Sequence, residues 1–276
     1  MTGTHSLGVG LGYREPFRSE LFLRPQAVDF LEVTADHFLG GSREKWRELD
    51  LLADHFTLVP HGLNLSLGSA EGIDQDYLET LAKLVERINP PWWSEHIAFT
   101  RAGGVAIGHL APLPFTREAV ATVQRNVEQV RRRIDVPLIL ENITYTVQWP
   151  EAEMSEGQFV REIGARTGCG LLLDVTNLYT NAMNHGEDPL EFLAQFPLDQ
   201  VVQLHLAGGH EHEGVLVDSH SQPAAEEVWD LLELVLQRAP VRGLILERDE
   251  NLPPFAEVER ELERARELGK RYGRWG

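Results

Sequence analysis

The sequence is poor in cysteine, in basic residues and in long apolar runs, and each shortage excludes a class of protein. Its 276 residues include one cysteine, Cys169, so an intrachain disulfide and a cysteine-based zinc site are both excluded. Cys169 precedes an apolar segment, which favours a buried structural thiol over a nucleophile. Lys and Arg total 25 against 43 Asp and Glu, a net charge of −18 that argues against nucleic acid and anionic membranes as partners.

Targeting and membrane-spanning segments are also missing from the pattern. The first 17 residues have neither a basic start nor a continuous apolar stretch, unlike a secretory signal. No segment approaches the roughly 18 consecutive apolar residues that a spanning helix needs. With 42% hydrophobic and 25% charged residues, the composition is that of a folded globular protein. We therefore expect a soluble, cytoplasmic protein.

Short apolar segments alternate with longer amphipathic segments along the whole chain. We predict strands at Ser6–Gly12, Val28–Val33, Thr57–His61, Trp93–Phe99, Val136–Glu141, Gly170–Asp174, Val201–Leu206 and Gly243–Glu247. Helices are predicted at Ser42–His55, Asp74–Ile88, Thr116–Ile134, Glu156–Thr167, Pro189–Phe196, Pro223–Arg238 and Pro254–Tyr272, with Pro189 and Pro223 in first turns. Eight such units predict an α/β fold, a single (β/α)8 TIM barrel spanning residues 1–276. A doubly wound sheet fits less well, because the glycines of Gly8–Gly12 lie inside the first strand rather than after it.

Acidic or imidazole side chains occur at the ends of six successive predicted strands. In a barrel, catalytic residues gather at the carboxyl ends of the strands, and the alternation of side chains can point these residues inward at a common depth. The sequence therefore predicts a functional site there. The six ends read Val59-Pro60-His61, Ser94-Glu95-His96, Leu140-Glu141-Asn142, Leu173-Asp174-Val175, Gln203-Leu204-His205 and Leu246-Glu247-Arg248.

A ring of buried acids and imidazoles is costly without partners, and bound cations offset that cost. Nitrogen and oxygen donors without thiolate suit iron, manganese or zinc. Each residue alone is more often a hydrogen-bonded barrel residue than a ligand, so the prediction depends on the set, which exceeds what one ion uses. We expect two or three ions, with Glu141 as the bridging ligand and Glu141, Asp174 and His205 as catalytic candidates. The candidate ligands are His61, His96, Glu141, Asp174, Asn177, His205, Asp218, His220 and Glu247.

The other histidines are expected to have different roles. We assign His5, His37, His55 and His109 to the surface or to structural roles, and His210 and His212 to a solvated loop. For His185 the pattern leaves two interpretations open, support of the metal ligands or packing of a loop. The pair Trp92-Trp93 is expected in the barrel core.

Short motifs at these same positions follow one another in a specific order and spacing. They are Gly10-Leu11-Gly12-Tyr13-Arg14, His61-Gly62-Leu63-Asn64-Leu65-Ser66-Leu67-Gly68, Ser94-Glu95-His96, Leu140-Glu141-Asn142, Leu173-Asp174-Val175-Thr176-Asn177-Leu178-Tyr179, Asn184-His185-Gly186, His205-Leu206-Ala207-Gly208 and Asp218-Ser219-His220-Ser221. Together they resemble the DUF692 family, the multinuclear non-haem iron-dependent oxidative (MNIO) enzymes. The resemblance runs from about Gly8 to Glu247.

The resemblance implies a TIM barrel that holds two or three irons, in mixed Fe(II) and Fe(III) states, at the nine candidate ligands. It also implies that dioxygen is the co-substrate and that the enzyme oxidises a residue, most often cysteine, of a ribosomally synthesised precursor peptide. Members often act with a small partner protein that grips the leader peptide. The chain departs from the family at Thr176, where Asn is frequent, and at Gln222, where His is frequent. Both lie near the third metal position, so the resemblance leaves an altered third site open.

Two other functions remain open on the sequence alone. Xylose-isomerase-like barrels, which include metal-dependent isomerases and phosphodiesterases, also place His, Asp and Glu at strand ends. No Lys or Arg cluster stands beside the candidate ligands, which argues against phosphate substrates. A non-enzymatic barrel that binds metal or peptide is the second alternative.

Overall fold

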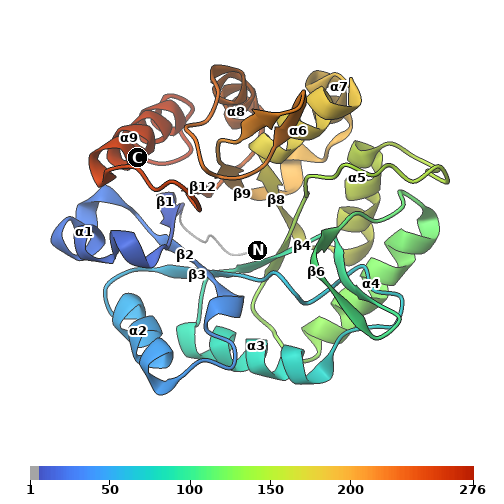
Figure 1. Cartoon of the computed structure of the whole chain (residues 1–276), viewed down its shortest axis with the longest axis horizontal. Helices are drawn as coiled ribbons and strands as arrows, with labels where there is room; N and C mark the ends of the chain where they lie inside the picture. The colour runs from blue at the N-terminus through green and yellow to red at the C-terminus, as the bar shows by residue number, and fades with distance from the viewer. Residues whose placement is uncertain (1–5) are drawn as a thin grey trace.

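Eight parallel strands close into a barrel in the computed structural model, which describes residues 6–276 (Figure 1). Each strand pairs with its neighbours along the chain, and the first strand closes the barrel against the last. All eight predicted strands and the (β/α)8 architecture are confirmed. The barrel strands are β1 (Gly8–Gly12), β2 (Leu31–Thr34), β3 (Leu58–His61), β4 (Trp93–His96), β7 (Leu138–Glu141), β8 (Gly170–Asp174), β9 (Val201–Leu206) and β12 (Gly243–Leu246).

Helices surround the barrel, and the seven predicted ones are confirmed to within a few residues (Figure 1). Side chains of Asp74, Thr116 and Ser155 accept hydrogen bonds from backbone N–H groups of the first turn, as expected of N-caps. The helices are α1 (Arg18–Leu23), α2 (Arg43–Ala53), α3 (Gln75–Ile88), α4 (Arg117–Arg131), α5 (Glu156–Thr167), α6 (Val175–His185), α7 (Pro189–Gln195), α8 (Glu226–Arg238) and α9 (Phe255–Arg271). Short 3₁₀ turns occupy Glu15–Phe17, Pro25–Ala27, Ala35–His37 and Leu198–Gln200.

Two details of the helix prediction were wrong. Pro223 does not lie in a first turn, because α8 begins at Glu226, and the chain around Pro223 instead packs against Gly208. Helix α6 was not predicted, since its sequence is rich in Asn and Thr, which have low helix propensity. It forms because the Asp174 side chain accepts hydrogen bonds from the N–H groups of Thr176 and Asn177.

Two antiparallel hairpins extend from loops that follow barrel strands. One consists of β5 (Phe99–Ala102) and β6 (Val105–Ala111), and the other of β10 (His210–His212) and β11 (Val215–Val217). The predicted strand Trp93–Phe99 therefore divides, with its last residue starting β5. Because both hairpins follow strand ends, they belong to the carboxyl side of the barrel. Figure 1 shows β6 near β4 and the orange β10–β11 hairpin near α6.

The barrel interior consists of an apolar layer beneath a polar one. Side chains two residues apart on a strand point to the same side. The apolar layer therefore has a polar counterpart two residues further along several strands, as in Val59 and His61 or Ile139 and Glu141. The apolar layer is formed by Phe30, Val59, Trp92, Ile139, Leu172 and Ile245, while Trp93 is buried in the main core outside it.

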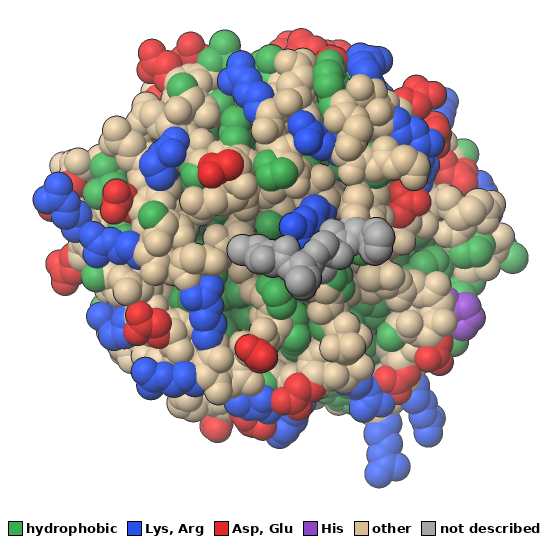
Figure 2. Space-filling model, turned by 180° about the vertical axis from the view of Figure 1, so that it is seen from behind, with side chains coloured by type: hydrophobic (Ala, Val, Ile, Leu, Met, Phe, Trp, Pro, Cys, Tyr) green, Lys and Arg blue, Asp and Glu red, His purple; other side chains and the backbone are tan. Residues whose placement is uncertain are grey.

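The surface opposite to the view of Figure 1 carries acidic and basic side chains interspersed with one another (Figure 2). The described side chains visible on that face do not concentrate the net charge of −18 in one place. None of the helices within residues 6–276 is both long and apolar enough to cross a bilayer.

Candidate metal centre

Polar side chains two residues beyond the apolar layer meet at the carboxyl end of the barrel. Glu141, Asp174 and His205 are each at most 2% exposed, while His61, His96 and Glu247 are also buried. Within residues 6–276, four sets of three residues have ligand atoms that lie within 4.8 Å of one another. The barrel thus brings the predicted strand-end residues together. The sets are Glu32 with His61 and His205, His61 with His96 and Glu141, Glu141 with Asp174 and His205, and Asp174 with His220 and Glu247.

Glu141 stands between two groups of histidines. Its Oε2 lies 3.5 Å from His61 Nε2 and 3.4 Å from His96 Nε2. Its Oε1 lies 3.1 Å from His205 Nδ1. The two oxygens of one carboxylate therefore face different nitrogen donors, which is the arrangement that a bridging ligand requires.

Each clustered histidine engages one ring nitrogen outside the cluster and directs the other into it. His61 Nδ1 lies 2.8 Å from the Ser94 hydroxyl, and His96 Nδ1 lies 3.1 Å from the carbonyl oxygen of Gly62. His220 Nδ1 lies 3.1 Å from Asp249 Oδ2. Such outer contacts are typical of metal-ligating histidines, because they fix the ring orientation and raise the basicity of the free nitrogen.

Gly62, the residue directly after β3, allows this geometry. A Cβ atom at Gly62 would lie 2.6 Å from Glu95 Oε2, which itself accepts a hydrogen bond from the N–H of Leu65. Any side chain at this position would displace Glu95 and the loop that it anchors, along with the carbonyl that contacts His96.

Unsatisfied polar atoms concentrate in this cluster. Native structures leave few buried side-chain oxygens or nitrogens without a hydrogen-bond partner. Among the described residues, nine such atoms occur, and six of them belong to predicted ligands. Several of these atoms face one another at close range without forming a hydrogen bond of normal geometry, as His220 Nε2 and Asp218 Oδ1 do at 2.9 Å. A cation between such atoms would satisfy them, and the residues fit a metal centre. The six are Glu141 Oε2, Asp174 Oδ2, Asn177 Oδ1, His205 Nδ1, Asp218 Oδ1 and His220 Nε2.

Burial and mutual charge shift the pKa values across the cluster. Burial disfavours the imidazolium of His96, but the charge of Glu141 together with the hydrogen bond and the charge of Glu95 outweighs it and raises the His96 pKa to about 9. Burial would raise the pKa of Glu141, yet His205 and His96 lower it to about 2. Burial, then the charge of Asp218, raises the pKa of Asp174 to about 8. Like charges thus crowd Asp174, which is a further reason for a cation beside it.

The loop after β9 supplies Asp218 and His220. His220 Nε2 lies 2.9 Å from Asp218 Oδ1. The backbone of His220 has a φ of 49°, a left-handed conformation that costs energy for a residue other than glycine. Gly208 lets this loop fold back, because a Cβ atom there would lie 2.2 Å from the carbonyl oxygens of Gln222 and Pro223. Both loop residues are half-buried, so this part of the cluster is the most accessible.

The two departures from the family pattern have different surroundings. The Thr176 hydroxyl donates to the carbonyl of Ala207 and accepts from its N–H, so it is tied to the backbone after β9. Gln222 is exposed, with its backbone N–H donating to Gly208. Asn177 donates through Nδ2 to the carbonyl of Asn142, which leaves its buried Oδ1 for another partner.

Sequence reasoning did not select Glu32 on β2. Its carboxylate lies 2.9 Å from His205 Nε2 and accepts a hydrogen bond from Gln203. Gln203 in turn accepts one from the indole of Trp92. This buried chain orients His205 so that Nδ1 points toward Glu141. Glu32 follows Phe30 of the apolar layer by two residues, and that spacing was the signal that could have revealed it.

The remaining described histidines and the cysteine belong to none of the four ligand sets. His210 and His212 are exposed on β10, a hairpin strand rather than the expected loop. His37, His55 and His109 are exposed, and His5 lies outside the described residues. The ring of His185 stacks on Tyr145, and its Nε2 contacts the Tyr145 carbonyl, so it packs the loop after β7. Cys169 is buried before β8, as expected, next to the Arg131 guanidinium.

One family model matches residues 8–270, nearly the whole chain. It describes the RiPP precursor modification enzymes MbnB/TglH/ChrH, which correspond to the DUF692 family. The chain belongs to this family. Family membership indicates an enzyme, and the buried ligand sets are compatible with metal binding.

Curated relatives and solved structures agree with this membership and with the fold. A UPF0276 protein of Caulobacter vibrioides is 39% identical over 260 residues, covering 94% of this chain and 93% of its own. Another, from Rhizorhabdus wittichii, is 37% identical and covers 99% of both chains. Among solved structures, D-psicose 3-epimerase from Clostridium cellulolyticum has a TM-score of 0.60 at 12% identity, with 98% of this chain and 100% of that one covered. Endonuclease IV from Thermus thermophilus has a TM-score of 0.57 at 15% identity, with 96% and 99% covered. At such identities these structures show the shared barrel and no more.

Proposed function

We propose that this chain is a multinuclear non-haem iron enzyme that uses dioxygen to oxidise a cysteine of a ribosomally synthesised precursor peptide. Family membership supports the precursor peptide as substrate. The observation that carries the metal part is the group of six unsatisfied ligand atoms in one buried cluster. Nitrogen and carboxylate donors without thiolate suit iron.

Three overlapping ligand sets support more than one ion. His61, His96 and Glu141 form the first set, and Glu141, Asp174 and His205 form the second. Asp174, His220 and Glu247 form the third, to which Asp218 adds an oxygen donor and Asn177 another beside Asp174. Glu141 and Asp174 each belong to two sets, so the same carboxylates would neutralise neighbouring ions.

When bound, iron supplies Lewis acidity toward a thiolate and electron transfer to dioxygen. The residues of the chain hold the ions and orient the ligands. Glu141 places negative charge between the first two sets, and the Glu32 carboxylate holds the His205 ring in one orientation. The apolar layer closes the barrel beneath the centre, so a substrate enters from the hairpin side.

A cysteine of the peptide is the proposed sulfur donor because the chain supplies none. Its single cysteine is buried before β8, at the opposite end of that strand from Asp174. A small partner protein that grips the leader peptide is part of the proposal by analogy with the family. Isomerase and phosphodiesterase alternatives have no support beyond a shared fold.

Iron loading and oxygen uptake test the proposal. The protein is reconstituted with Fe(II) without oxygen and its iron is quantified. Air is then admitted with the cysteine-bearing peptide encoded beside the gene, or with the same peptide carrying serine. We expect more than one iron per chain, a visible thiolate-to-iron absorption band, and oxygen uptake with the cysteine peptide only.

Controls separate loss of metal from loss of fold. Glu141→Gln should lose iron and activity, whereas Glu227→Gln, an exposed carboxylate on α8, should keep both. Full activity of metal-free protein would refute the metal proposal. Equal oxidation of the serine peptide without the absorption band would refute the thiol-directed reaction and leave the metal centre standing.

A further inference from the structure

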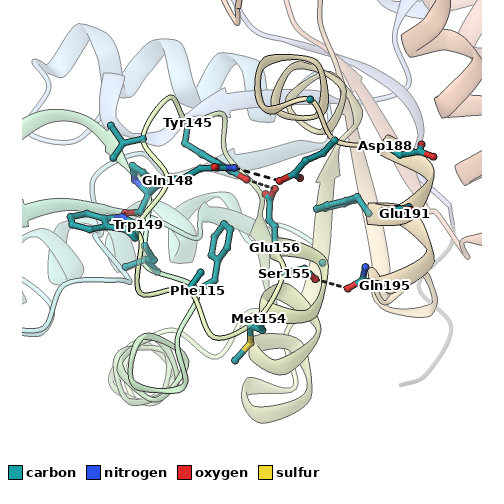
Figure 3. A pocket seen from close by; sticks show the side chains of 18 residues that line it. Phe115, Tyr145, Gln148, Trp149, Met154, Ser155, Glu156, Asp188, Glu191 and Gln195 are labelled. Atoms are coloured by element: carbon teal, nitrogen blue, oxygen red, sulfur yellow. Dashed lines mark hydrogen bonds between the residues drawn. The ribbon is translucent and has the colours of Figure 1, made fainter.

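A cavity of about 650 Å³ lies beside the barrel, between the loop after β7, the start of α5 and helix α7 (Figure 3). Figure 3 shows Trp149 on one side, Asp188 and Glu191 on the other, and Glu156 between them. Val147 and Trp149 expose 56% and 40% of their surface there. A cavity of this size holds a long side chain with its neighbouring backbone, and it is far larger than one ion needs.

The cavity lies at the same end of the barrel as the candidate metal centre, because it is lined by the loop that follows β7. A smaller cavity of about 20 Å³ shares Leu113, Tyr145 and Glu156 with it and is also lined by Ile97 and Asn142. Ile97 and Asn142 directly follow His96 and Glu141 in the chain. A peptide whose reacting residue lies at the metal centre therefore has this cavity within reach of a flanking residue.

Carboxylates line the cavity without a cationic partner. They are Glu156, Glu187, Asp188 and Glu191, and the described lining residues include no Lys, Arg or His. Their contacts are with neutral groups: Tyr145 donates its hydroxyl to Glu156, Gln148 donates to Glu187, and Asp188 caps α7. Burial, together with the charge of Glu187, raises the pKa of Glu156 to about 8. Glu156 is therefore mostly protonated at pH 7, and the negative charge that the described lining presents to the cavity comes from Glu187, Asp188 and Glu191, with no positive charge among the lining residues to balance it.

Aromatic side chains complete the walls. Phe115, Tyr145, Trp149 and Phe192 line the same space. An arginine or lysine has an apolar stem that packs on such rings and a charged end that pairs with carboxylates. Arginine adds a planar guanidinium that stacks on rings and binds carboxylates through two parallel hydrogen bonds.

We propose that this cavity binds a basic side chain, best an arginine, of the precursor peptide next to the residue that is oxidised. The proposal rests on the proposed function for the identity of the peptide. The binding chemistry itself rests on the unpaired carboxylates and the aromatic wall.

Binding of short labelled peptides to the purified protein tests the proposal. The probes are fluorescein-labelled Gly-Arg-Phe-Arg-Gly and the same peptide with glutamine in place of both arginines, followed by fluorescence anisotropy. The double variant Glu187→Gln/Glu191→Gln removes two exposed carboxylates of the cavity. The matched control, Glu227→Gln/Glu267→Gln, changes the net charge equally on exposed positions of α8 and α9.

The expected result is tighter binding of the arginine peptide than of the glutamine peptide. The cavity variant should weaken the arginine peptide by roughly fivefold to tenfold, since partly exposed ion pairs contribute modestly. The control variant Glu227→Gln/Glu267→Gln should bind the arginine peptide with unchanged affinity. Equal weakening in both double variants, or equal binding of the two peptides, would overturn the proposal. Peptide binding is measured without oxidation. A negative binding result therefore does not contradict the proposed oxidase activity, and absence of that activity does not affect the interpretation of the binding result.

Discussion

Metal binding by the metal-free protein should release at least two protons per chain near pH 7. His96 has its pKa raised to about 9, and Asp174 has its pKa raised to about 8, so both carry a proton at neutral pH. The outer contact of His96 is through Nδ1, so the nitrogen that faces Glu141 is Nε2. Metal ligation requires the lone pair of Nε2 and an ionised Asp174, and both protons must therefore leave.

The size of the effect follows from these two pKa values. A ligand whose pKa lies above the pH costs nearly tenfold in metal affinity for each unit that the pH falls. Between pH 7 and pH 6 the two groups together should weaken binding about a hundredfold, or about 2.7 kcal/mol. The pKa values of His205 and His220 are also raised above 6.5, chiefly by Glu247 against the effect of burial. The hundredfold figure is therefore a lower bound.

A chelator competition titration measures this dependence. Zn(II) or Co(II) replaces iron to avoid oxidation, affinity is determined from pH 6 to pH 8.5, and an indicator dye reports the protons released. Asp174→Asn should release about one proton fewer and show a correspondingly shallower pH dependence. An affinity that stays constant across this range, or release of less than one proton at pH 7, would refute the assignment of His96 and Asp174 as protonated ligands.

Three further outcomes are expected. Metal-free protein should lose thermal stability as the pH rises from 6.5 to 9, because the raised pKa values of His96 and Asp174 mean that the folded state binds more protons than the unfolded state; a melting temperature that rises with pH would contradict this. Glu141→Ala should lower the iron content more than His220→Ala, since Glu141 serves two ligand sets; equal loss would argue against a bridge. Glu32→Gln should weaken metal affinity by about 10- to 100-fold without unfolding the protein, as removal of an orienting contact does; unchanged affinity in the titration above would contradict the orienting role.

The sequence was sufficient to predict the barrel and most of the clustered side chains, because both depend on the alternation of side-chain direction along each strand. An apolar residue at one position of a strand predicts an inward side chain two residues later. His61, Glu141 and Asp174 were found in this way from the ends of their strands. Glu32 was missed because it lies one residue inside the predicted strand Val28–Val33, where only the pairing with Phe30 places it in the polar layer.

Features that depend on distant segments were beyond the sequence. The β5–β6 hairpin has little burial to produce a periodic pattern, although the Gly103-Gly104 pair was a turn signal. Helix α6 depends on a cap from the same aspartate that joins the cluster. The acidic cavity forms from three separate segments of the chain, at 112–115, 145–157 and 186–195, so no local sequence motif predicts it.

The polar layer leads us to expect that folding and metal binding are coupled in this barrel. The apolar layer fixes the strand register, and that register forces Glu141, Asp174 and Glu247 into one buried space regardless of their mutual repulsion. Histidines offset part of this cost, as the lowered pKa of Glu141 shows, but the burial and like charges at Asp174 remain uncompensated. A ligand that binds only the folded state stabilises it, by about 2.7 kcal/mol at a hundredfold excess over its dissociation constant. We therefore expect metal ions bound at this site to stabilise the folded barrel by relieving the crowding of charge around Asp174.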